Sequence, residues 1–141
     1  MRGPAPTGGG GTVASVSTLA DTSLTADEMA LLERFSVLLR GRLGAALHAT
    51  WLFGSRARGE RPSHEDSDVD VLVLVDDASW EGQQAVHRAF EDAGRELGLE
   101  QSTVWFSIHI HSPEWLAGRR AIKSFFIAEV DRDKVVVTGS E

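Results

Sequence analysis

The run Val71-Leu72-Val73-Leu74-Val75 is the feature of this sequence that most limits the folds open to it. β-Branched residues favour extended backbone. A strand that is apolar on both faces is typical of the centre of a sheet covered on each side by other elements. The run therefore predicts an α/β or α+β domain in which helices cover a sheet.

Signals for helices and strands flank this run along the rest of the chain. Thr25 and Glu28 form a T-x-x-E capping box, which predicts the start of a helix that ends near residues 41–44. The other predicted elements are strands over residues 47–53, 69–75, 103–111 and 135–137, and helices beginning at Ser79, at Ser112 and near Ile122. Helices and strands thus alternate along one chain, as an α/β or α+β sheet covered by helices requires.

The first 23 residues differ in composition from the remainder. They are rich in Gly, Pro, Ser and Thr and include the run from Gly8 to Gly11. Such a segment buries too little apolar surface to offset the entropy lost on ordering. We therefore predict a disordered tail over residues 1–23 and one folded domain over residues 24–141, a length that fits a single core.

Charge and composition narrow the partners and the location. The formal net charge of -7 repels phosphate backbones, so no extended nucleic-acid surface is expected, although a small nucleotide needs only one cationic pocket. No apolar run approaches the ~18 residues that cross a bilayer, and the N-terminus lacks the apolar core of a secretory signal, so no membrane association is expected. The absence of cysteine excludes disulfides and thiolate metal sites and agrees with a cytoplasmic location.

The segment Leu52-Phe53-Gly54-Ser55-Arg56-Ala57-Arg58-Gly59 places a glycine turn between a strand and helix-forming residues. Glycine lets a phosphate approach the backbone closely, and a helix start offers free N–H groups to an anion. Ser55 adds a hydroxyl donor, and the guanidinium forks of Arg56 and Arg58 suit phosphate oxygens. The Gly-Lys-Ser/Thr ending of a Walker A loop is absent. We predict that Gly54, Ser55, Arg56 and Arg58 bind a nucleotide; a solvated loop is the alternative interpretation for the arginines.

Asp68 and Asp70 stand at the head of the apolar strand over residues 69–75. Residues two apart in a strand share a face, about 7 Å apart along the chain. Two neighbouring carboxylates at the head of an apolar strand repel each other and lose hydration, and a divalent cation removes that cost. Oxygen-only ligands favour Mg²⁺ or Mn²⁺ with phosphates completing the shell, so the pair is a predicted metal site.

The two segments together resemble a known family. G-S-R-A-R-G and S-D-V-D-V-L-V, spaced as G-S-x12-D-x-D, are similar to the minimal nucleotidyltransferases of the DNA polymerase beta superfamily. The core of this resemblance runs from about Leu52 to Val75, and looser similarity continues through S-P-E-W and residues 124–126 to the strand over residues 135–137.

The resemblance implies a small mixed β-sheet, ATP or another nucleoside triphosphate, and two metal ions. Carried over by position, Gly54 and Ser55 hold the terminal phosphates, and Asp68 and Asp70 hold the metals and act in catalysis. The predicted function is Mg²⁺-dependent transfer of a nucleoside monophosphate from ATP to an acceptor hydroxyl, with release of pyrophosphate.

The sequence departs from the family at a third carboxylate, which active members usually carry on a later strand beside the aspartate pair. The corresponding strand over residues 103–111 contains no Asp or Glu, and Glu100 and Glu114 lie outside it. Its alternation sends one apolar set to the core and the other set towards the site: the first is Val104, Phe106, Ile108 and Ile110, and the second is Trp105, Ser107, His109 and His111.

Histidine can act as a general base near neutral pH. His109 is in mid-strand and better fixed than His111, so we predict that His109 is the catalytic residue closest to the aspartate pair. Solvent-facing strand positions are the alternative interpretation for both histidines.

The missing carboxylate also supports a second hypothesis from another class of protein. In it, the chain is a weakly catalytic or non-catalytic nucleotide-binding module that modifies or masks a protein partner. In the related family such domains pair with small helical HEPN-type toxins, for which they serve as antitoxins, and an acidic chain suits a basic partner.

Overall fold

The computed structural model describes residues 19–60 and 68–141, in which one sheet has the strand order β3-β2-β1-β4. Its strands are β1 (Leu47–Phe53), β2 (Val69–Val75), β3 (Phe106–His111) and β4 (Val135–Gly139). The β1 strand pairs antiparallel with β2 and with β4, whereas β2 and β3 are parallel. The sheet is therefore mixed, and the predicted fold class, a small mixed sheet covered by helices, is confirmed.

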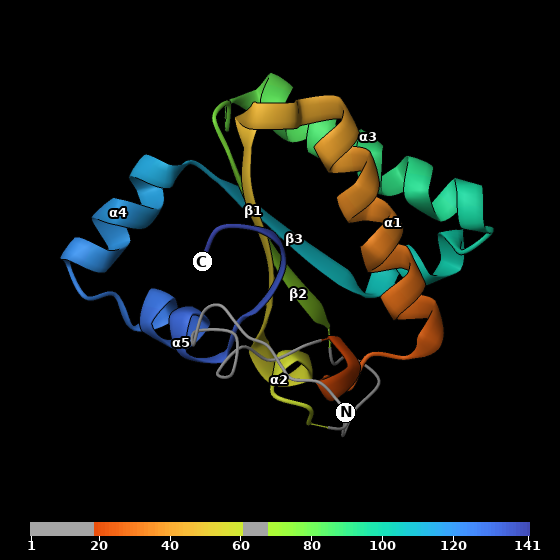
Figure 1. Cartoon of the computed structure of the whole chain (residues 1–141), viewed down its shortest axis with the longest axis horizontal. Helices are drawn as coiled ribbons and strands as arrows, with labels where there is room; N and C mark the ends of the chain where they lie inside the picture. The colour runs from red at the N-terminus through yellow and green to blue at the C-terminus, as the bar shows by residue number, and fades with distance from the viewer. Residues whose placement is uncertain (1–18, 61–67) are drawn as a thin grey trace, which may run out of the picture.

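Helices cover both faces of this sheet (Figure 1). The α-helices are α1 (Ala26–Leu43), α2 (Gly54–Ala57), α3 (Trp80–Leu97), α4 (Pro113–Ala121) and α5 (Phe125–Asp133), and the 3-10 turns are η2 (Leu19–Asp21), η3 (Gly44–Ala46) and η4 (Glu100–Trp105). Figure 1 shows α1 and α3 on one side of the strands and α4 and α5 on the other. In the part of the chain that is described, none of these helices combines the length and the apolarity that a bilayer crossing requires.

The central strand β2 contributes to a core on each face, as its composition predicts. Val71 and Val73 pack in the cluster that contains the inner faces of α1 and α3. Leu72, between them, packs with Ile127 and Val130 of α5 in a second cluster. Because alternate residues of a strand face opposite sides, Asp70 lies on the α4–α5 side of the sheet.

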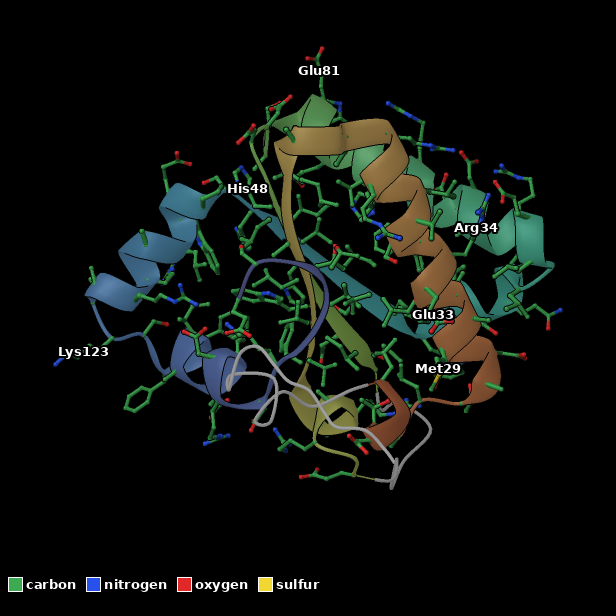
Figure 2. The ribbon with its side chains drawn as sticks, in the orientation of Figure 1. Met29, Glu33, Arg34, His48, Glu81 and Lys123 are labelled. Atoms are coloured by element: carbon green, nitrogen blue, oxygen red, sulfur yellow. The ribbon has the colours of Figure 1, made fainter. Side chains whose placement is uncertain are left out.

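The α1 helix is capped and held as the sequence indicates. The Thr25 hydroxyl accepts from the Glu28 N–H at 3.1 Å, and the Glu28 carboxylate accepts from the Thr25 N–H at 2.9 Å, which completes the capping box. Arg34 of α1 pairs with Glu96 of α3 at 2.6 Å, on the flank where Figure 2 shows these two helices side by side. These contacts fix the layer that lies opposite the candidate site.

The predicted tail extends too far into the chain. Residues 1–18 lie outside the described residues, but residues 19–23, which we expected in the same tail, are bonded to the domain. Leu19 begins the turn η2, and the Ser23 N–H donates to the Arg56 carbonyl at 3.0 Å. This backbone hydrogen bond to α2 helps to offset the conformational entropy lost when the segment is ordered, a contribution that composition does not reveal.

The third strand begins later than predicted. Residues 103–105 belong to η4, where the Thr103 hydroxyl donates to the Glu100 carbonyl at 2.6 Å and stabilises a turn. Val104, expected on the buried face, is 72% exposed. The expectation holds from Phe106 onward, because Phe106, Ile108 and Ile110 all pack on the α1–α3 side.

Candidate functional site

Gly54 and Asp70 meet where β1 ends beside the start of β2. Phe53 pairs with Asp70 in the antiparallel register, so the turn after Phe53 passes directly over the aspartate. Gly54 has φ +81°, in the left-handed region that favours glycine. A Cβ added to Gly54 would lie 2.7 Å from Asp70 Oδ2. Glycine is therefore required here twice, by the backbone conformation and by the carboxylate.

The helix expected after Gly54 is a single turn. The α2 helix covers only Gly54–Ala57, so any contribution of a helix dipole to anion binding is small. The Ser55 carbonyl accepts from the Glu60 N–H at 3.1 Å. The Ser55 hydroxyl has no hydrogen-bond partner among residues 19–60 and 68–141. Local backbone N–H groups and this hydroxyl, rather than a long helix, are what the turn offers to a phosphate.

Arg56 lies in the interior instead of at the predicted phosphate site. Only 3% of it is exposed, and its guanidinium pairs with the carboxylate of Glu28 on α1. Its Nε donates to Ser23 Oγ at 3.0 Å, and its Nη2 donates to the Ser23 carbonyl at 3.1 Å. Arg56 thus ties α2 to the start of α1. Its partners lie 28 and 33 residues earlier in the chain, a distance that motif spacing does not reveal.

Arg58, in contrast to Arg56, lines a pocket together with Gly54 and Asp70. Its Nε lies 2.8 Å from Glu60 Oε2, and its Nη1 lies 3.0 Å from Asp133 Oδ2 on α5. The hydrogen bonds with Glu60 and then Asp133 raise the pKa of Arg58, so it stays charged. Arg132 and then Arg58 hold the pKa of Asp133 below its usual range. The ion pair between Arg58 and Asp133 links the α2 turn to α5.

A pocket of about 240 Å³ lies between the α2 turn and α5. Its lining combines the predicted phosphate turn, the second aspartate and one stripe of α5: Phe53, Gly54, Arg58, Asp70, Phe126, Glu129, Val130 and Asp133. The last four recur at positions i, i+3, i+4 and i+7, so they share one face of the helix. Phe126 and Val130 were predicted on this helix as apolar residues, whereas Glu129 and Asp133 were not predicted near the site; the spacing of all four is the signal of one helical face.

Asp68 and Asp70 fit a divalent cation by their chemistry. Val69, the first residue of β2, is fully buried under α1 and α3, so Asp70 after it faces the opposite side of the sheet, and Asp68 directly precedes the strand. Asp68 is exposed, and Asp70 is partly buried; Asp66 and Ser67 lie outside the described residues. Within the described ranges no three metal-binding side chains gather as a ready ligand set. The two oxygen donors therefore suit an ion whose shell a bound phosphate completes.

The β3 strand presents Ser107 and His109 to this site. Ser107 is the direct register partner of Asp70, and His109 is that of Leu72. His109 Nε2 lies 3.9 Å from Asp70 Oδ1 and 3.3 Å from Ser107 Oγ. The prediction that His109 lies on the same side of the sheet as Asp70 is confirmed. Ser107 stands where a carboxylate on this strand would lie closest to the aspartate.

His111 occupies a different environment from His109. Its ring stacks on Trp115 of α4, with centroids 3.6 Å apart and an interplanar angle of 7°. Burial, followed by the neighbouring His109 and Arg119, lowers the pKa of His111 from its usual range. Glu100 lies in η4 and Glu114 in α4, and neither lines the pocket with Asp70.

Comparison with known proteins found one family and a solved structure to which the chain is similar. The family described as "Nucleotidyltransferase domain" matches residues 45–128, more than half of the chain. A solved structure described as a toxin-antitoxin with AMP-PNP aligns at 18% identity and a TM-score of 0.46, over 77% of this chain and 74% of that chain. No curated protein matches. The family match includes the Gly54 turn, both aspartates and the start of α5.

Proposed function

This chain belongs to the nucleotidyltransferase domain family, and on that premise we propose that it transfers a nucleoside monophosphate from ATP to an acceptor hydroxyl. The observation that carries the proposal is the contact between Gly54 and the Asp70 carboxylate. It brings a turn suited to phosphates and a carboxylate suited to a metal into one pocket. Neither group alone would distinguish this reaction from simple anion or cation binding.

The residues around the pocket have separable tasks in this proposal. The backbone at Gly54 and the Ser55 hydroxyl donate to the terminal phosphates, and Arg58 adds positive charge beside them. Asp68 and Asp70 hold Mg²⁺ or Mn²⁺, which when bound neutralises the triphosphate and favours in-line displacement. Arg56 has no direct part, because its guanidinium is buried against Glu28, whereas that of Arg58 remains partly exposed.

His109 is the proposed base. Its Nε2 lies 3.9 Å from Asp70 Oδ1, within reach of an acceptor bound beside that carboxylate. Ser107 Oγ lies 3.3 Å from the same nitrogen, so the Ser107 hydroxyl turns away from Nε2 when Nε2 takes the proton. As the acceptor oxygen bonds to the α-phosphorus, its proton passes to Nε2, and the bond to the departing pyrophosphate breaks. A base positioned in this way contributes about 10²- to 10⁴-fold to the rate.

A second candidate function follows from Ser107. With serine as the register partner of Asp70, β3 supplies no carboxylate for a second metal. The chain would then bind Mg²⁺-ATP without efficient transfer and act on a protein partner, of which a HEPN-type toxin is the candidate. Stoichiometric recovery of such a partner would favour this function.

Label transfer separates the two candidates. The protein is incubated with Mg²⁺, with fractionated RNA, protein and small-molecule acceptors, and with ATP labelled at either the α- or the γ-phosphate. Transfer of α-label alone supports the enzyme, whereas calorimetric binding of Mg²⁺-ATP without transfer to any fraction supports the binding module. Absence of Mg²⁺-dependent ATP binding would contradict both.

The aspartate variants provide the control for that experiment. Asp68→Asn and Asp70→Asn are expected to abolish Mg²⁺-dependent ATP binding and label transfer. The fold stays intact, and the metal-free protein becomes slightly more stable, because repulsion between the carboxylates is relieved. Unchanged affinity in both variants would mean that the site lies elsewhere.

A further inference from the structure

One face of α5 forms a wall of the pocket, and its two ends differ in chemistry. Asp133 at one end holds Arg58, the cation beside the Gly54 turn. Phe126, seven residues earlier, lines the same pocket about 10 Å away along the helix axis. The wall therefore runs from a charged end, next to the proposed phosphate site, to an aromatic end.

Phe126 is held firmly and is still accessible. Its ring centroid lies 5.6 Å from that of Phe53, 6.1 Å from that of His109 and 6.4 Å from that of Trp115. Even so, 39% of Phe126 remains exposed, beside the pocket that it lines. Three ring contacts thus orient an apolar surface without covering it.

The neighbouring Phe125 shows that exposure alone is not the signal. Phe125 begins α5 after the turn at Lys123 and is 89% exposed. It does not line the pocket and makes none of the ring contacts described for Phe126. Figure 2 shows Lys123 pointing outward from the molecule at this turn. Phe125 and Phe126 therefore form a matched pair, one ring at the pocket and one outside it.

We infer that the exposed ring of Phe126 is the stacking surface for the nucleobase of the bound nucleotide. This inference rests on the proposed function. With the phosphates at Gly54 and Arg58, the nucleoside can extend along α5 towards Phe126. A pocket of about 240 Å³ is below the ~300–1,000 Å³ of most ligand sites, so it encloses part of a nucleotide and leaves another part on an open surface such as this ring.

Stacking on an aromatic ring fits the chemistry of any nucleobase, because every base has a π-face. Removing such a ring typically weakens binding about 5- to 150-fold, the equivalent of ~1–3 kcal/mol per base. The triphosphate moiety makes no such contact. Phe126 is thus expected to contribute to the affinity for ATP and not to that for inorganic tripolyphosphate.

The test is calorimetry on the full chain with Mg²⁺, using ATP and tripolyphosphate as separate ligands. Phe126→Leu keeps an apolar side chain in the ring cluster but removes the π-face, and Phe126→Tyr keeps the ring. We expect Phe126→Leu to lose at least fivefold in ATP affinity with unchanged tripolyphosphate affinity, and Phe126→Tyr to bind ATP as the unmodified chain does. Phe125→Leu is the matched control and is expected to change neither.

The remaining outcomes overturn the inference in distinguishable ways. Unchanged ATP affinity in Phe126→Leu would mean that the ring serves the acceptor or packing alone. An equal loss for ATP and tripolyphosphate would show a general distortion of the pocket. If the unmodified chain binds neither ligand with Mg²⁺, both the proposed function and this inference are contradicted.

Discussion

Ser107 lies directly beside Asp70 in the parallel pairing of β2 and β3, on the strand for which the family resemblance implies a third carboxylate. This pairing makes Ser107→Asp a gain-of-function test. The new carboxylate is expected to raise the apparent Mg²⁺ affinity of the ATP complex about tenfold. That gain, ~1.4 kcal/mol, is a modest share of the attraction between charges ~4 Å apart at an effective dielectric of 20.

Ser107→Asn is the uncharged control for that variant, and Mn²⁺ binding can be followed by electron paramagnetic resonance in parallel with calorimetry. Without metal, Ser107→Asp is expected to be less stable than Ser107→Asn because of repulsion from Asp70. Equal metal affinities for the two variants would show that a side chain at position 107 does not contact the bound metal.

Gly54→Ala tests the contact between the phosphate turn and Asp70. The added Cβ meets Asp70 Oδ2, and φ +81° is strained for alanine, so we expect a loss of about 1–3 kcal/mol in the free energy of unfolding. Displacement of the carboxylate is also expected to abolish Mg²⁺-ATP binding. Urea denaturation and calorimetry measure the two effects.

Gly118→Ala is the matched control for Gly54→Ala. Gly118 lies inside α4, and a Cβ there meets no atom within 4 Å. This variant is expected to retain ATP binding and to gain up to about 1 kcal/mol in stability from helix propensity. If both glycine variants behave alike, the steric argument at Asp70 is wrong.

Substitution of the two arginines of the Gly54 turn is expected to have opposite effects, a loss of stability for Arg56 and a loss of ATP binding for Arg58. Arg56→Gln leaves the buried Glu28 carboxylate without its charge partner and is expected to cost about 3–5 kcal/mol of unfolding free energy. Arg58→Gln removes the exposed pair with Glu60 and the pair with Asp133, but Asp133 keeps Arg132 as a charge partner. The variant is therefore expected to change stability by no more than about 1 kcal/mol while weakening Mg²⁺-ATP binding.

Urea denaturation and ATP calorimetry on the same two proteins give the answer. If the Arg56→Gln protein is fully stable but has lost ATP binding, Arg56 is a phosphate ligand, as its motif predicted.

His109→Gln is expected to lower the rate of label transfer about 10²- to 10⁴-fold with little change in ATP affinity, because a base acts in the transition state. His111→Gln is the control, since His111 lies on the same strand face but stacks on Trp115. An equal fall in rate and ATP affinity would identify His109 as a ligand or packing residue instead.

Much of the fold follows from local signals in the sequence. The apolar strand over residues 69–75, the cap at Thr25 and the glycine at position 54 each act over a few residues, and the structure has them where predicted. The face of the third strand that carries His109 also follows from alternation, because a period of two needs no tertiary information.

Long-range partners could not be predicted in the same way. Arg56 looked like a phosphate ligand because its motif gives no sign of Glu28, 28 residues earlier. Glu129 and Asp133 gave no local sign of which sheet face their helix covers, so their place at the pocket appears only in the folded chain. Val104 was misplaced because a side-chain bond at Thr103 favours a turn over the strand pattern.

The hydrogen bonds between Ser23 and Arg56 limit how far this domain can be truncated at its N-terminal side without disturbing the α2 turn. A shortened protein starting at residue 24, where composition suggests that the domain begins, would lack both Ser23 acceptors of the Arg56 guanidinium. Loss of these acceptors would disturb Arg56, which directly follows Ser55 in the turn that we assign to the nucleotide. An expression plasmid for ligand-binding work is therefore best designed to begin no later than Leu19, where the described chain starts.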